Sequence, residues 1–188
     1  MRRTLRIVLE AALLTLAACM LILPSAASAG PPARGHHGHP ANFPRANQGR
    51  IPPAPPVHKG QGAPREVERL ATGHTNDTPH VNRNHWYGHA APTDARFHLG
   101  HAFAHGKFAR VGPGFRYEVI RFDLARHWFW LPGGFSFEVA AWDWPLCADW
   151  CWDCGDDFVV YDDPDHIGWY IVYNVHLGVY VHAQYMGQ

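Results

Sequence analysis

The chain has 188 residues, a formal net charge of zero and an aromatic content of 13%, a length that fits one domain of ordinary size with additional segments. All 16 Lys and Arg residues lie at or before Arg126, and the chain from His127 onward carries nine acidic residues and no basic one. An acidic second half argues against nucleic-acid binding, and the sequence has no nucleophile elbow, phosphate-binding loop or HExxH pattern.

Residues 1–29 have the pattern of a secretory signal peptide. Arginines precede an apolar run, and the A-x-A motif that ends at Ala29 predicts cleavage between Ala29 and Gly30. The letters LAAC, ending at Cys19, are similar to a bacterial lipobox, so a lipoprotein anchored at Cys19 and an uncleaved anchor are the alternatives. We therefore expect an exported protein of the periplasm or the extracellular space, with no membrane span after cleavage.

Residues 30–92 predict a disordered linker rich in Pro, Gly and His. Nine prolines lie between Pro31 and Pro64, and large apolar side chains are scarce, so little surface is available to offset the entropy of ordering. We expect disorder or partial polyproline II structure here. The GHHGH stretch places His36, His37 and His39 within four residues, where imidazoles on a flexible chain can bind Zn, Cu or Ni. The alternative is that these histidines only solvate the linker.

More histidines follow at the end of this segment and just beyond it. His85 and His89 form a pair, and His98, His101 and His105 form a second group. We interpret both groups as scattered polar residues at a domain edge, with a joint metal site as the alternative.

Residues 93–188 predict an aromatic-rich β domain. Between Phe115 and Tyr185 there are 19 aromatic residues, a type that suits pleated, half-buried surfaces. Pro132-Gly133-Gly134 supplies the chemistry of a tight turn. The expected strands cover residues 114–119, 127–131, 135–142, 158–161, 168–175 and 179–186. The predicted fold is mainly β, a small antiparallel barrel or sandwich of about five to seven strands.

Two resemblances follow from this half of the chain. The stretches FWLPGGFSFEVA, DDFVVYDDPDHIGWYIVYN and LGVYVHAQYMG resemble a group of uncharacterised exported bacterial proteins, over roughly residues 105 to 188, and this implies export and a coherent fold. The last hairpin, GWYIVYNVHLGVYVHAQYM, is similar to the last hairpin of bacterial SH3-like domains, with Tyr180 in place of the usual Trp.

Three cysteines remain in an exported mature chain: Cys147, Cys151 and Cys154. An oxidising compartment favours one local disulfide with one spare thiol, in any of three pairings. The spacing also fits three ligands of a tetrahedral Zn site, with His166 or an Asp as the fourth, and unpaired structural thiols are a further alternative. Redox catalysis is excluded because the neighbouring aspartates would raise the thiol pKa and no helix follows.

Eight aspartates lie between Asp143 and Asp165. Carboxylates clustered on loops can bind Ca²⁺, although neither DCGDD nor DDPDH has the EF-hand spacing. Asp is also a preferred turn residue because its side chain caps nearby backbone N–H groups, and this is the interpretation we favour. No cofactor is certain from the sequence, and Zn and Ca are the candidates.

These observations predict an exported cell-envelope protein that acts as a non-catalytic binding or structural module. Its expected partner is an envelope polymer or another protein, and we do not expect it to bind nucleic acid. No catalytic residue is assigned. The alternatives are a periplasmic metal-binding protein that uses its His, Cys and Asp clusters for Zn, Cu or Ni, and a domain that binds or hydrolyses glycan or peptidoglycan.

Overall fold

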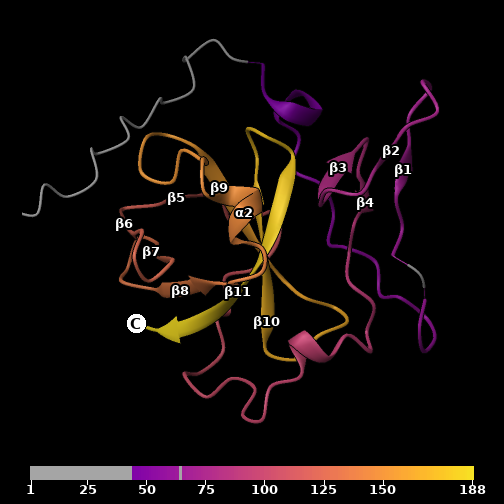
Figure 1. Ribbon diagram of the computed structural model, residues 1–188. Helices are drawn as coiled ribbons and strands as arrows, with labels where there is room; N and C mark the ends of the chain where they lie inside the picture. Colours follow the sequence, from indigo (N-terminus) through magenta and orange to yellow (C-terminus); the bar gives the residue numbers. More distant parts are fainter. Residues whose placement is uncertain (1–43, 64) are drawn as a thin grey trace, which may run out of the picture. The chain divides into compact units, whose positions relative to one another are not determined.

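A computed structural model describes residues 44–63 and 65–188 (Figure 1). The predicted signal peptide with its cleavage site at Ala29 and Gly30, the lipobox Cys19, and His36, His37 and His39 lie outside the described residues. Within the described part of the chain, no helix has the length and apolar character needed to cross a membrane.

The described residues form mainly β structure with three short helical turns. The helical turns are η1 (Ala46–Gly49), η2 (Ala95–Phe97) and α2 (Trp144–Cys147). The strands are β1 (Glu68–Arg69), β2 (Thr75–Asn76), β3 (His80–Asn82), β4 (His85–Tyr87), β5 (Tyr117–Glu118), β6 (Arg121–Asp123), β7 (Trp128–Trp130), β8 (Ser136–Val139), β9 (Asp157–Asp162), β10 (Trp169–Asn174) and β11 (Val179–Gly187).

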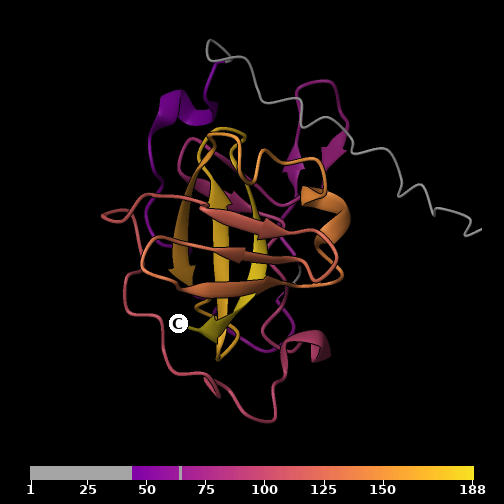
Figure 2. The ribbon, with the colours of Figure 1, turned by 90° about the vertical axis from the view of Figure 1, so that its left-hand side faces the viewer.

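Seven strands follow one antiparallel path in the order β5-β9-β10-β11-β8-β7-β6. The nine-residue β11 pairs with β10 through its first part and with β8 through its last part, where the register shifts between Tyr185 and Gly187. The sheet therefore curls, and β6–β8 cross the direction of β9–β11 (Figure 2). The predicted curled antiparallel fold is confirmed for residues 93–188.

The main core lies between the two halves of this curled sheet. Side chains alternate along each strand, so Phe158 and Val160 of β9 face inward together with Tyr170 and Val172 of β10. They pack against β7 and β8 and against the turns around α2. The other fully or almost fully buried members are Phe108, Tyr117, Val119, Phe129, Leu131, Phe137, Val139, Cys147, Trp150, Trp152, Val181 and Ala183.

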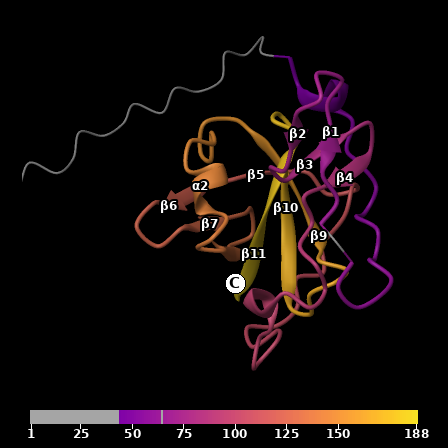
Figure 3. The same ribbon diagram turned by 45° about the vertical axis from the view of Figure 1, so that its right-hand side comes forward.

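A second layer covers the opposite face of β9–β11. All six residues of β10 are buried, so both faces of this strand are covered, and the second face is lined by aromatic residues such as Tyr161, Tyr173 and Tyr180. Val81 of β3 and Trp86 of β4 pack onto it, and β3 pairs with β11 through Val179 and His80. Figures 1 and 3 show β3 and β4 on the side of the central strands that faces away from β6 and β7.

This arrangement corrects the predicted boundary, because residues 44–63 and 65–92 belong to the folded body instead of a disordered linker. Pro52 and Pro55 are buried, the Tyr161 hydroxyl donates to the Pro52 carbonyl (2.7 Å), and the Trp86 indole donates to the Pro53 carbonyl (3.1 Å). A segment poor in apolar residues is ordered because the sheet supplies the aromatic surface, and a few side chains suffice to bind it.

Candidate metal centre

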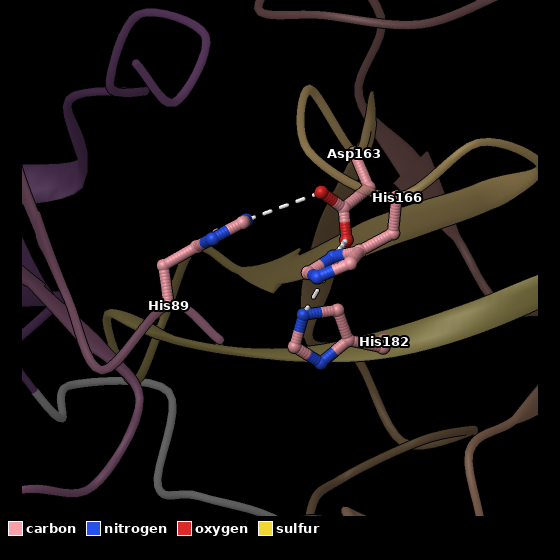
Figure 4. A group of neighbouring side chains, drawn as sticks. All are labelled: His89, Asp163, His166 and His182. Carbon is pink, nitrogen blue, oxygen red and sulfur yellow. Dashed lines mark hydrogen bonds and ion pairs between the residues drawn. The ribbon is translucent and has the colours of Figure 1, made fainter. Parts of the chain in front are cut away.

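Four side chains from distant parts of the sequence converge in the interior: His89, Asp163, His166 and His182 (Figure 4). One potential ligand atom from each lies within 4.8 Å of those from all the others. Asp163 is 7% exposed and the three histidines 2–3%. Buried ionisable groups of this kind are normally paired with one another or bound to a metal, so their local geometry decides what they can do.

Asp163 and His166 are held by the tight turn between β9 and β10. The Asp163 Oδ1 atom accepts the backbone N–H of Asp165 at 3.0 Å, a local bond that Asp makes readily in turns. Its Oδ2 atom lies 2.7 Å from His166 Nδ1. Gly168 closes the turn at φ +87°, and a Cβ there would lie 2.9 Å from the Ala102 Cβ, so the turn requires glycine on both counts.

His182 extends from β11 on the same face as Tyr180, and Asp143 fixes its orientation. Asp143 precedes α2 but does not cap that helix. Its Oδ2 atom accepts the backbone N–H of His182 at 2.8 Å and lies 2.6 Å from the His182 ring Nδ1. The opposite ring nitrogen, Nε2, is 3.6 Å from Asp163 Oδ2. A carboxylate behind a histidine is the usual outer-shell arrangement of metal-ligating imidazoles.

His89 comes from the covering layer, two residues after β4. Its Nδ1 lies 3.0 Å from the Ala90 carbonyl and 3.1 Å from Asp165 Oδ2, and its Nε2 lies 3.2 Å from Asp163 Oδ1. The residue before it, Gly88, has φ +76°, and a Cβ there would lie 3.0 Å from the Pro79 Cα. Close backbone packing thus brings this histidine to the sheet.

The hydrogen-bond partners determine which ring nitrogens face the centre of the group. His89 Nδ1 and His182 Nδ1 both face acceptor oxygens, so in the neutral rings they carry the proton. The Nε2 atoms are then lone-pair acceptors, and neither has a hydrogen-bond partner although both are buried. Each points toward the Asp163 carboxylate (Figure 4). A lone pair on each Nε2 atom would repel the Asp163 carboxylate, and a metal ion between them or a second proton on the ring would remove that repulsion.

The charges of the group also require a cation. Among the described residues, every ion pair of Asp143, Asp163 and Asp165 is made with a histidine, and none with Lys or Arg. Burial raises the pKa of Asp163, but the contacts with His166, His89 and His182 outweigh burial and hold it well below its usual range. Asp163 is therefore a carboxylate, and its charge is balanced by protonated imidazole or by a metal ion.

A pocket borders the group on the side of His182. Its volume is about 430 Å³, and its lining includes Asp143 and His182 together with Arg65, Arg96 and Trp142. Arg96 is held by Asp94, with Nη2 to Oδ2 at 2.6 Å. The pocket gives solvent a path to one edge of an otherwise buried group.

A second, smaller group adjoins the first and shares His89 with it. It consists of His58, His89 and Asp165, with potential ligand atoms also within 4.8 Å of one another. These two groups are the sets of close His, Cys, Asp and Glu ligand atoms found among the described residues, and neither contains a cysteine.

The predicted zinc site with cysteine ligands is not among the groups found in this part of the chain. The sulfur atoms of Cys151 and Cys154 lie at disulfide distance, with Cα atoms 5.1 Å apart, and Cys147 is a free thiol buried in the main core. His166, proposed as their fourth ligand, belongs to the Asp163 group instead. One local pair with one spare thiol is the arrangement expected for an oxidising compartment.

Sequence reasoning identified His166 as a potential ligand and missed Asp163, His182 and the role of His89. A pairing signal was present in the DDPDH turn, which combines a turn-forming Asp with a His three residues later. The partners that follow β4 and lie on β11, His89 and His182, are brought together by the pairing of the strands, which local spacing does not reveal. No protein-family model matches this chain, and neither does any curated protein or solved structure searched.

Proposed function

We propose that this protein is an exported metal-binding β protein that holds one divalent transition-metal ion, Zn²⁺ fitting best, between His89, Asp163, His166 and His182. The observation that carries the proposal is the pair of buried Nε2 atoms, on His89 and His182, that lack a hydrogen-bond partner and point at one carboxylate. A cation between them converts a repulsive contact into three coordinate bonds.

The chemistry of the donor set supports Zn²⁺ over Ca²⁺. Three imidazoles and one carboxylate suit Zn and related ions, whereas Ca²⁺ takes six to eight oxygen ligands. Tetrahedral bonds of the length that Zn²⁺ forms place ligand atoms about 3.3 Å apart. The distance from Asp163 Oδ1 to His89 Nε2 is 3.2 Å, and those from Oδ2 to His166 Nδ1 and His182 Nε2 are 2.7 and 3.6 Å, all near this value.

Each histidine has the outer-shell partner that metal ligation requires. His89 Nδ1 faces the Ala90 carbonyl, His166 Nε2 faces the Ala91 carbonyl at 2.9 Å, and His182 Nδ1 faces Asp143. These bonds fix the ring orientation and the tautomer. Four protein ligands close the coordination sphere, as in structural sites, whereas catalytic sites keep one position open.

In this role the ion links two parts of the chain. His89 comes from the layer formed by residues 65–92, whereas Asp163, His166 and His182 come from the central strands and their turn. Metal binding would therefore fasten the covering layer onto β9–β11. The export that we infer from the N-terminal pattern, and the Cys151–Cys154 pair, support a location where Zn²⁺ is taken from the surroundings.

The test is the metal content of the protein purified without a metal-affinity step, followed by Zn²⁺ titration after chelation. We expect bound metal in the purified protein and tight rebinding of Zn²⁺, and the ion held by these four residues should be lost in His182→Ala and Asp163→Asn. His85→Ala is the matched control, because the His85 side chain is half exposed and its ring contacts Glu66 and Tyr87 and no member of the group. Equal Zn²⁺ binding by His182→Ala and wild type would refute the site.

A further inference from the structure

Each ring nitrogen of His89 faces a buried carboxylate oxygen. Its Nε2 lies 3.2 Å from Asp163 Oδ1 and its Nδ1 lies 3.1 Å from Asp165 Oδ2. The two carboxylates come from the same turn, on either side of Pro164. One ring therefore separates two carboxylates, and each carboxylate has further histidine partners.

Asp165 has a second histidine partner, His58, which lies in the proline-rich segment. Residues Pro52, Pro55 and His58 recur with a spacing of three, the repeat of a polyproline II helix, and the first two are buried while His58 is partly buried. The His58 backbone N–H donates to Asp165 Oδ1 at 2.9 Å, and its ring Nδ1 contacts Asp165 Oδ2. The His58 ring stacks on His89, with centroids 4.9 Å apart.

We propose that a second divalent transition-metal ion binds between His58, His89 and Asp165, so that the His89 imidazole bridges two ions. This rests on the proposed function, because the inner ion occupies the Nε2 side of the same ring. The outer ion takes the place of the proton that Nδ1 otherwise shares with Asp165 and the Ala90 carbonyl, and that proton leaves to solvent. Asp165, whose side chain is 1% exposed, then gains a cation as partner.

The two ions would differ in what they can do. The inner ion has four protein ligands and is closed. The outer ion has three, and His58 is 19% exposed at its side chain, so a water molecule or a small ligand can complete the coordination sphere. Three protein ligands with one open position is the arrangement of catalytic zinc. The outer site is therefore the place where exchangeable ligand chemistry would occur.

The experiment is native mass spectrometry of the full chain after chelation and reloading with Zn²⁺. Every protein carries His36→Ala, His37→Ala and His39→Ala, so that the GHHGH stretch contributes no ions. We expect two Zn²⁺ in this starting protein, two in the His85→Ala control and one in His58→Ala. His58→Gln, which keeps a hydrogen-bonding group beside Asp165, should also hold one and guards against a folding defect.

The outcomes separate the two proposals. One Zn²⁺ in the starting protein, or two in both His58 variants, overturns the outer site and leaves the inner site standing. No Zn²⁺ in the starting protein overturns both. A second readout uses Cu²⁺, because two copper ions joined by one imidazole ring couple magnetically. The EPR intensity per bound copper should then be low in the starting protein and return to its full value in His58→Ala; full intensity in both contradicts a bridge.

Discussion

At the scale of single residues, His166 shows how a proton would compete with a metal ion at the site that we propose. Its two ring nitrogens face the Asp163 carboxylate and the Ala91 carbonyl, and both contacts are satisfied at once only by the doubly protonated ring. Burial lowers the pKa of His166, but the hydrogen bond and charge of Asp163 outweigh burial and leave this pKa raised. A metal ion at Nδ1 must displace that proton.

We therefore predict opposite pH trends with and without metal. The folded-state pKa of His166 lies above its unfolded value, so in chelated protein its contribution to the free energy of unfolding is complete below about pH 6.5 and is lost as the pH rises through the raised value. Zn²⁺ affinity should instead increase over the same range, because the ligand releases its proton. Thermal denaturation across this range, with chelator or with Zn²⁺, measures both trends. An unchanged slope in chelated His166→Gln would show that another group is responsible.

Asp143 tests the orientation of a ligand without removing one. In Asp143→Asn the side chain keeps its size but no longer holds His182 Nδ1 with a charge, so Zn²⁺ affinity should fall by roughly 10- to 100-fold. Competition titration against a chromophoric chelator measures the change. Asp149→Asn, an exposed Asp just beyond α2, is the control and should retain wild-type affinity. Equal affinity in the two variants would remove Asp143 from the site.

At the scale of elements, the central strand β10 explains why the chain needs two layers. A strand with alternating burial needs one cover, but every residue of β10 is buried. One face packs against β7 and β8, and the other against Trp86 and its neighbours. The Trp86 ring lies edge-on to Tyr161, Tyr173 and Tyr180, with centroids 5.1–5.8 Å apart.

Trp86→Ala should therefore weaken both the fold and the metal site. We expect a loss of about 3–5 kcal/mol in the free energy of unfolding, the usual cost of truncating a buried aromatic side chain. Zn²⁺ affinity should fall as well, because His89 lies three residues further along the same segment. Urea denaturation and Zn²⁺ titration check the two effects. Trp128→Ala, on the partly exposed face of β7, should cost less, and an equal cost would contradict the special role of Trp86.

The sequence predicted the hairpins of the second half better than the layer that covers them. Alternating aromatic runs and the Pro132-Gly133-Gly134 turn are local signals, and β7 and β8 appear where they indicate. The layer before residue 93 depends on a few contacts to distant tyrosines, which composition does not reveal. One signal was available, because WYIVYN is apolar on both faces and a strand of that kind needs a second cover. The group of His89, Asp163, His166 and His182 could be predicted only in part, because only Asp163 and His166 lie close together in the sequence.

At the scale of the whole molecule, metal binding should be measurable as thermal stability. A ligand that binds only the folded state at a free concentration 100 times its dissociation constant stabilises by about 2.7 kcal/mol. For a chain of this length that corresponds to a rise of roughly 5–10 °C in the melting temperature. We expect this shift on Zn²⁺ addition to chelated wild type by differential scanning calorimetry. Its presence in His182→Ala would show that the stabilising ion binds elsewhere.

If the proposed inner ion is bound, its loss would also release the contact that His89 makes between the covering layer and the central strands. His89 is the one member of the inner group supplied by the covering layer, and beneath that layer lie Tyr161, Tyr173 and Tyr180. If this layer then detached, the backbone around His89 would be exposed to proteases, and the tyrosine face beneath it would be an exposed apolar surface. Removal of the proposed ion should therefore make residues 65–92 more accessible to an added protease.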